Sequence, residues 1–256
     1  MTIDANAARS FGPAADLYDS IRPTYPAEAL RWLTGDGPAD DAADAAKDVV
    51  DLGAGTGLLT RGLIALGHRV TAVEPDERML AKLTASSPGL TASQVGAAEA
   101  LPLPDASADV VTAGQAFHWF DRGRALPEIR RVLRPGGVLA PIWNVRDESV
   151  DWVHALTEAI GVSQGERDAL AAAAPGYFGS EFAEAEHRVF RHTWPMDRAR
   201  LVRLVQSRSY YLTADEARRS QIVAVVNDVV DTHPDLRGEE TFAMPYNTYA
   251  FRVRRD

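Results

Sequence analysis

The sequence predicts an α/β protein built on a doubly wound, mainly parallel sheet. Strand and helix signals alternate from Val49 to Asn144, a pattern typical of parallel strands joined by right-handed helical crossovers. The first strand signal runs into glycines 53, 55 and 57, which turn the chain into a helix. Ligands in such sheets bind beyond the carboxyl ends of the strands. The polar residues there or just after are Asp51, Glu74, Glu99, Gln115 and Asn144.

Five strands and three helices account for this alternating region. Short apolar runs predict strands at 48–52, 69–74, 91–95, 108–114 and 137–143. Between them we expect helices near 57–66, 76–84 and 121–133. Gly67 ends the first helix, Asp121 can cap the last, and Pro135 with the two following glycines prevents that helix from continuing.

The residues that follow Asn144 have a different pattern. We expect helices near 151–160, 166–173, 197–208 and 214–232, and strand-like runs from Glu186 to Trp194 and from Thr241 to Val253. Before the alternating region, the Ala/Asp-rich tract from Gly35 to Asp48 is polar and low in complexity. Such a composition favours a surface connection.

The glycine-rich turn predicts a ligand site of a particular kind. Glycine lets a ligand lie against bare backbone, and the new helix presents free N–H groups. A dinucleotide site would need a glycine where Leu58 stands, and a P-loop would need a lysine that is absent. Glu74 ends the second strand 17 residues after Gly57, where a carboxylate can accept both ribose hydroxyls. The spacing predicts a ribonucleoside with a small zwitterionic end, and S-adenosylmethionine fits that description.

Four segments, taken in order, resemble the class I S-adenosylmethionine-dependent methyltransferases. Asp51–Gly57 (D-L-G-A-G-T-G) is similar to the family's first motif, and Val73–Leu80 is similar to its second. Ala98–Pro102 resembles the loop on the adenine side, and Arg134–Gly137 resembles the turn before the fifth strand. The four together favour the family more strongly than any one of them.

The lead segment Phe11–Pro26 resembles the F-x-x-x-A-x-x-Y-x-x-x-R-P-x-Y lead of small-molecule methyltransferases, within the methyltransferase type 11 and trans-aconitate-methyltransferase-like branch. The resemblance implies a Rossmann-like doubly wound sheet of seven strands, the last antiparallel, with an N-terminal lid and a helical insertion before strand six. It divides one compact domain into an N-terminal helical lid and connection (1–47), a cofactor-binding core (48–146), and an acceptor-pocket insertion with the final two strands (147–256).

The same resemblance implies a set of cofactor contacts. Arg22 in the lid is placed to meet a carboxylate, Glu74 holds the ribose, and Asp51 supports the glycine turn or the cofactor's ammonium group. Many relatives have an aspartate where this chain has Ala97, so adenine needs another acceptor, either Glu99 or a backbone carbonyl. The lid aromatics have an alternative role in packing. The expected cofactor-binding residues are Tyr18, Arg22, Asp51, Gly53, Ala54, Gly55, Gly57, Glu74, Pro75, Ala98, Glu99 and Gln115.

The segment Gln115–Phe120 follows the fourth strand, where the transferred methyl group should point. Methyl transfer needs alignment, exclusion of water and, for a neutral acceptor, a group that takes the proton. His118 is therefore the candidate catalytic residue, although a packed structural histidine is the alternative, and an already ionised carboxylate acceptor would need no base. Acceptor contacts are expected from Tyr25, Trp119, Trp143, Asn144 and Tyr210, and core packing accounts equally well for any one of the aromatic residues.

The composition of the chain limits the kinds of molecule that it is expected to bind. The net charge is −9 with only two lysines, which disfavours nucleic acid because phosphate binding needs clustered cations. The absence of cysteine excludes a thiolate metal site, and His187 and His192 should point to opposite faces of a strand, so we expect no metal. The start of the sequence is unlike a secretory signal, and no apolar run reaches the length of a membrane span. We expect a cytoplasmic protein, monomer or homodimer, with a small-molecule acceptor and no membrane partner.

The leading hypothesis is metal-independent methyl transfer from S-adenosylmethionine to the oxygen, nitrogen or carboxylate of a small organic acceptor. The second hypothesis is a nicotinamide oxidoreductase. The sequence disfavours it because Leu58 stands where a dinucleotide site needs a glycine. The third is a non-catalytic module that binds S-adenosylmethionine or a protein partner. Turnover separates the first hypothesis from the third.

Overall fold

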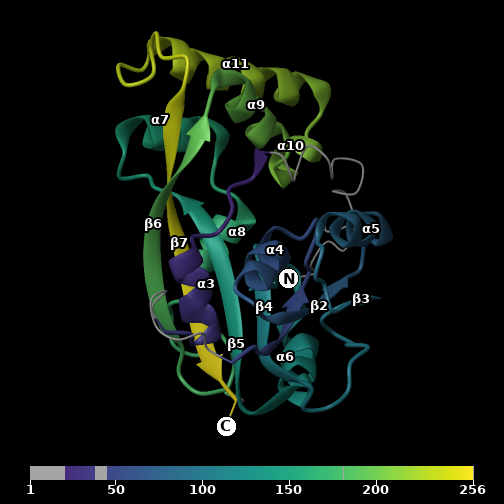
Figure 1. The fold of residues 1–256 in the computed structure, drawn as a ribbon. Coiled ribbons are helices and arrows are strands. Elements are labelled where there is room, and N and C mark those ends of the chain that lie inside the picture. The colour runs from purple at the N-terminus through teal and green to yellow at the C-terminus, as the bar shows by residue number, and fades with distance from the viewer. Residues whose placement is uncertain (1–20, 38–44, 181, 256) are drawn as a thin grey trace.

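The computed structural model describes residues 21–37, 45–180 and 182–255. Within them lies a seven-stranded sheet in the order β3-β2-β1-β4-β5-β7-β6 (Figure 1). Neighbours from β3 to β5 pair in parallel, whereas β7 runs antiparallel to both β5 and β6. The predicted Rossmann-like sheet with an antiparallel last strand is confirmed. The strands are β1 (Asp48–Leu52), β2 (Arg69–Glu74), β3 (Ala92–Val95), β4 (Ala108–Gly114), β5 (Leu133–Arg146), β6 (Glu186–Met196) and β7 (Phe242–Arg254).

Helices cover both faces of this sheet and form a further layer at one end of it (Figure 1). A single turn of 3₁₀ helix, η2 (Phe117–Trp119), follows β4. The α-helices are α3 (Ala27–Thr34), α4 (Leu58–Ala65), α5 (Glu77–Ser86), α6 (Arg122–Val132), α7 (Asp151–Ile160), α8 (Gln164–Ala171), α9 (Arg198–Gln206), α10 (Ser209–Leu212) and α11 (Glu216–Thr232).

Successive side chains along the strands point to opposite faces of the sheet, so each face has its own apolar core. Val50 and Leu52 of β1 belong to a cluster with apolar residues of α6 and α8. Val49, one position out of phase, packs with α3 and α4. Successive strand side chains point to opposite faces, so a strand buried on both sides is a nearly continuous apolar run. That is why the sequence shows Val-Val-Asp-Leu here instead of an alternating pattern.

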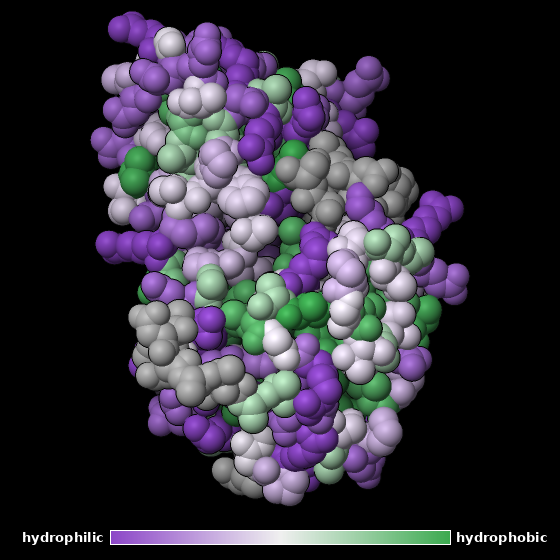
Figure 2. All heavy atoms as spheres, viewed as in Figure 1, coloured by the Kyte–Doolittle hydropathy of each residue, from purple (hydrophilic) through white to green (hydrophobic). Residues whose placement is uncertain are grey.

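A separate helical layer of α7, α9, α10 and α11 stands beyond the upper ends of β6 and β7 (Figure 1). Its own core joins Trp152, Leu201 and Val226 to Met244 and Tyr246 of β7. Its outward surface, at the top of Figure 2, is predominantly hydrophilic. The layer comes from two connections, because α7 and α8 precede β6 whereas α9 to α11 lie between β6 and β7. The expected insertion before strand six is therefore only one part of the helical layer.

The predicted elements are present, with differences at their ends. β5 runs from Leu133 to Arg146 because Leu133 pairs with Ala108 and its last residues pair with β7, whereas the apolar signal alone predicted 137–143. Helix α3 lies within residues 1–47, which were expected as a helical lid and connection without bounds for any helix, and Gly35 ends it at a φ of 74°. Among the described residues, no helix is long and apolar enough to cross a membrane.

Candidate active site

A cavity of about 510 Å³ opens at the carboxyl ends of β1, β2 and β4, a size typical of small-molecule sites. The sheet side contributes Gly55, Glu74 and Gln115, the helical layer contributes Arg208, and the start of α8 contributes further residues. The cavity therefore lies between the parallel sheet and the added helices. Of the expected cofactor contacts, those lining it are Arg22, Gly53, Gly55, Glu74, Pro75, Ala98, Glu99 and Gln115.

The three glycines of the turn have different surroundings, although each has a positive φ, of 62° at Gly53, 56° at Gly55 and 90° at Gly57. A Cβ at Gly57 would lie 2.8 Å from Cγ of Leu83, so this glycine permits α5 to pack, and it does not line the cavity. A Cβ at Gly55 would meet only Sδ of Met79, at 4.0 Å. Gly55 is the glycine whose missing side chain leaves space in the cavity.

Glu74 ends β2 with its carboxylate at the cavity wall. Its Oε2 accepts a hydrogen bond of 2.9 Å from the Gly55 N–H, and its Oε1 accepts one of 3.0 Å from the Asp76 N–H. Burial raises the pKa of this carboxyl, and the two N–H donors act in the opposite direction. Each carboxylate oxygen can accept a second hydrogen bond. Glu74 therefore fits the ribose of the expected cofactor.

Asp51 lies beneath the turn, outside the main cavity. It is fully buried, accepts a hydrogen bond of 2.6 Å from Oγ1 of Thr60 in α4, and has its pKa raised to about 7 by burial. It lines a separate cavity of about 40 Å³ together with Tyr25 and Ala54. The bond to Thr60 supports the expected role in holding the turn, and an interaction with the cofactor's ammonium group stays a prediction.

The carboxylate of Glu99, an expected acceptor for adenine, is already partly engaged. Its Oε1 accepts a hydrogen bond of 2.8 Å from the backbone N–H of Asp121, which itself caps α6 through Gly123. Met79 also lines the cavity and was not predicted from the sequence. It lies on the apolar face of α5, where its sequence signal is the same as that of a core residue.

His118 and Trp119 also line the cavity, with ring centroids 4.8 Å apart. Nδ1 of His118 is buried and has no hydrogen-bond partner among the described residues. Burial, assisted by the charge of Arg208, lowers the pKa of His118 to about 4 against an opposing effect of Asp168. A Cβ at Gly165 would lie 2.9 Å from Cε1 of His118, so the glycine lets α8 approach the ring.

Trp143 and Asn144, two of the expected acceptor contacts, lie in the sheet and not in the cavity. Trp143 is 0% exposed and packs edge-on against Phe117 and Phe251. Asn144 donates from Nδ2 to the carbonyl oxygens of Pro23 (3.3 Å) and Thr24 (3.1 Å), and neither residue lines the cavity. Because β5 continues to Arg146, both residues lie inside the sheet instead of beyond its edge.

The other predicted residues are divided among three places. Tyr25 and Ala54 line the small cavity under the turn. Tyr210 packs against the core of the helical layer and does not line the main cavity. Tyr18 lies outside the described residues. Only Trp119 of the five expected acceptor contacts lines the main cavity.

The residues that the helical layer and the start of α8 add to the site were not predicted from the sequence. Arg208, 8% exposed, follows α9, and Ser163, Gln164 and Gly165 begin α8. An ion pair of 2.9 Å between Nε of Arg146 and Oε1 of Glu166 fixes α8 to β5. Although burial raises the pKa of Glu166, Arg146 and Arg208 lower it to about 2. No local motif marks these residues, because folding alone brings them to the cavity.

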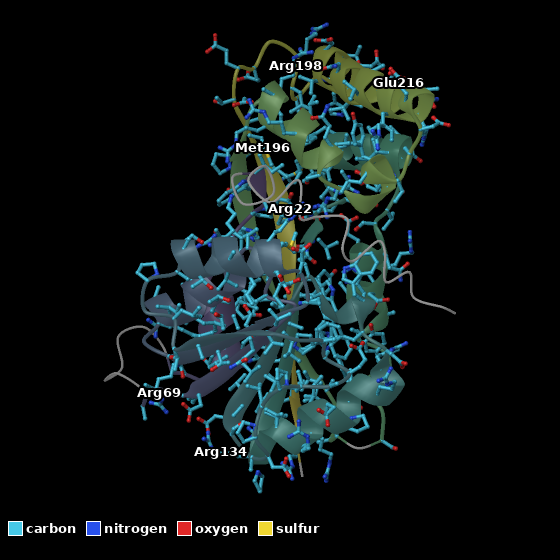
Figure 3. The ribbon with its side chains drawn as sticks, turned by 90° about the vertical axis from the view of Figure 1, so that its right-hand side faces the viewer. Arg22, Arg69, Arg134, Met196, Arg198 and Glu216 are labelled. Atoms are coloured by element: carbon cyan, nitrogen blue, oxygen red, sulfur yellow. The ribbon has the colours of Figure 1, made fainter. Side chains whose placement is uncertain are left out.

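Arg22 stands at the junction of sheet and helical layer (Figure 3), where it lines the cavity and is 8% exposed. Two of its neighbours in the sequence, Pro23 and Thr24, are the ones that Asn144 holds. The parts of the chain that the structure describes hold no group of three His, Cys, Asp or Glu side chains arranged to bind a metal ion.

The sheet order and a nucleoside-sized cavity over a glycine turn define a Rossmann-like methyltransferase. Residues 50–140 match the methyltransferase domain family. The chain is 41% identical over 246 residues to an uncharacterized methyltransferase of Mycobacterium tuberculosis, covering 95% of each, and 33% identical over 241 residues to one of Schizosaccharomyces pombe, covering 93% of each. This chain belongs to the class I S-adenosylmethionine-dependent methyltransferases, and its cofactor is S-adenosylmethionine.

Solved structures of methyltransferases have a similar fold. A protein from Anaeromyxobacter dehalogenans described as a type II methyltransferase is similar with a TM-score of 0.60 and 28% identity, over 91% of this chain and 96% of that one. A protein from Anabaena variabilis, described as a methyltransferase from an antibiotic biosynthesis pathway, shares the fold with a TM-score of 0.57 at 17% identity, over 88% of this chain and 95% of that one.

Proposed function

We propose that this enzyme methylates a small organic acceptor without a metal ion. The observation that carries the proposal is the single cavity that extends from Gly55 and Glu74 to His118 and Trp119. One wall suits a ribonucleoside, and the other combines aromatic surface with few polar groups, as acceptor pockets do. S-adenosylmethionine supplies a methyl group on a positively charged sulfur, which is already a good leaving group.

The residues of this chain then have defined tasks. Glu74 binds the ribose hydroxyls, Gly55 leaves room for the cofactor, and Arg22 meets its carboxylate. The helical layer excludes water and holds the acceptor in line with the methyl group, and both effects accelerate a direct displacement. Pro75, Ala98 and Gln115 line the remaining cofactor wall.

His118 is the proposed catalytic residue at the acceptor. A pKa of about 4 keeps the ring neutral above pH 5, so it can accept a hydrogen bond throughout the neutral range. The same low pKa makes it a weak proton acceptor, since general bases act best when their pKa is near the working pH. The lowered pKa therefore favours a role in orienting the acceptor.

The experiment has two stages. Calorimetry with S-adenosylhomocysteine, the demethylated product, should show one site per chain. Mass spectrometry of a library of small alcohols, amines and acids, incubated with enzyme and S-adenosylmethionine, should then show products that gain one methyl group, with or without EDTA. Binding without any turnover would favour the non-catalytic alternative, and loss of turnover with EDTA would contradict metal independence.

Two further expectations from the sequence remain part of the proposal. The enzyme acts in the cytoplasm, and it is a monomer or a homodimer. Cell fractionation and light scattering test these two points independently of the chemistry.

A further inference from the structure

Arg208 brings a guanidinium group into the acceptor part of the cavity. The residue lies between α9 and α10, lines the cavity and is 8% exposed. It lines the same cavity as His118, and its charge acts on both His118 and Glu166. Guanidinium groups bind carboxylates and phosphates through two parallel N–H donors, and this geometry is most effective away from bulk water.

Among the described residues, arginines outnumber carboxylates around this end of the cavity. The charged side chains that act most strongly on the hydroxyl of neighbouring Tyr210 are Arg208, Arg146, Glu166 and Arg22. The Glu166 carboxylate accepts hydrogen bonds from Arg146 and from the Ser163 N–H. Asp168, which acts on His118, accepts from the Tyr177 hydroxyl at 2.6 Å and from Gln164 at 3.2 Å.

The first turn of α8 faces the same space. Ser163, Gln164 and Gly165 line the cavity, and Ser163 caps the helix in a capping box with Glu166. The first N–H groups of a helix have no acceptor within the helix, and the helix dipole favours negative charge at this end. Ser163 and Glu166 cap each other at this end, so the N–H groups of the turn that favour an anion are those of Gln164 and Gly165.

We propose that Arg208, supported by the first turn of α8, binds an anionic group of the methyl acceptor, so that the substrates are small organic anions carrying a carboxylate or a phosphate. This inference rests on the proposed function and adds the substrate class and a specificity-determining residue. It assigns Arg22 to the cofactor and Arg208 to the acceptor, so the two arginines should differ in which ligand they affect.

The test uses the full-length protein saturated with S-adenosylhomocysteine, so that only the acceptor part is probed. Calorimetry compares acetate, benzoate and succinate with their amides, and adds phenyl phosphate and inorganic phosphate. At least one anion should bind about tenfold or more tightly than its neutral counterpart, the usual scale for a charged hydrogen bond. Carboxylate and phosphate probes distinguish the two anionic groups.

Three variants complete the test. Arg208→Gln should remove the preference for the anion, Arg208→Lys should keep part of it, and Arg203→Gln, an exposed arginine on α9, should leave it unchanged. Unaltered binding of S-adenosylhomocysteine by Arg208→Gln shows that the fold and the cofactor part are intact. Anions that bind no better than amides, or a preference that survives in Arg208→Gln, would overturn the inference while leaving the proposed function in place. A wild-type protein that fails to bind S-adenosylhomocysteine would overturn both.

Discussion

Nη2 of Arg22 donates a hydrogen bond of 2.9 Å to the backbone carbonyl oxygen of Ser207, 185 positions further along the chain. The bond joins the segment that precedes α3 to the end of α9, beside the cavity. Arg22 is 8% exposed and Ser207 is 0% exposed, so both ends of this connection are buried. Residues 21–26 and the helical layer are therefore joined beside the cavity.

Arg22→Met should weaken both the fold and the cofactor site. The substitution keeps the length of the side chain and removes its donors, so the Ser207 carbonyl loses a charged partner at a cost of about 1–3 kcal/mol in the free energy of unfolding. We expect affinity for S-adenosylhomocysteine to fall about tenfold or more, as measured by calorimetry. Arg237→Met, at an exposed position, is the control. Unchanged affinity in a folded Arg22→Met protein would restrict Arg22 to a structural role.

Gly55→Ala should reduce cofactor binding more than its effect on stability explains. The new Cβ would face the cavity beside Met79, and the φ of 56° adds strain of about 1–2 kcal/mol. Gly67→Ala is a matched control, because Gly67 has a φ of 89° and nothing within 4 Å of the added Cβ. Urea denaturation should show similar losses in the two variants, and calorimetry should show lost affinity only in Gly55→Ala. Equal affinities would place the cofactor elsewhere.

Glu74→Ala should weaken binding of S-adenosylhomocysteine by about 1.5–3 kcal/mol, the usual value for charged hydrogen bonds. Part of any loss comes from the Gly55 N–H, which Glu74 also holds. The 2′-deoxy analogue separates the two effects. Wild type should discriminate against it, and Glu74→Ala should bind both ligands almost equally. Equal discrimination by the two proteins would mean that Glu74 does not read the ribose.

The sequence predicted the sheet and the glycine turn well because both depend on local signals. An apolar run, three glycines and an acid at a set distance specify the β1 turn and Glu74 without knowledge of the rest of the chain. The acceptor wall depends on which distant segments meet. The apolar signal predicts that β5 ends near Trp143 and Asn144. Pairing with β7 extends the strand to Arg146, so both residues lie within it. Arg208 has no motif, and its position follows from the packing of α9 against the sheet end.

His118→Gln should reduce the amount by which the free energy of unfolding falls when the pH is lowered. The folded-state pKa of about 4 lies below the ordinary histidine value of 6.5. The unfolded chain therefore takes up a proton first, and stability is lost as the pH falls from about 6.5 to 4. The contribution is at most about 3 kcal/mol. Urea denaturation at pH 7.5 and 5 should show a smaller difference in His118→Gln than in wild type, whereas the exposed His154→Gln should match wild type.

The rate of methyl transfer tests what His118 does for the acceptor. A neutral ring that orients the substrate gives a single-turnover rate without an inflection from this group between pH 6 and 8, because its pKa lies well below that range. Glutamine can replace the hydrogen bond but cannot take up a proton, so His118→Gln should keep more of the rate than His118→Ala. General-base help would instead be worth about 10²–10⁴-fold and would be lost equally in both variants. An inflection of the rate near pH 7 that disappears in His118→Gln would show that His118 accepts the proton. It would also show that the pKa of His118 in the cofactor-bound enzyme is far from its value in the free protein.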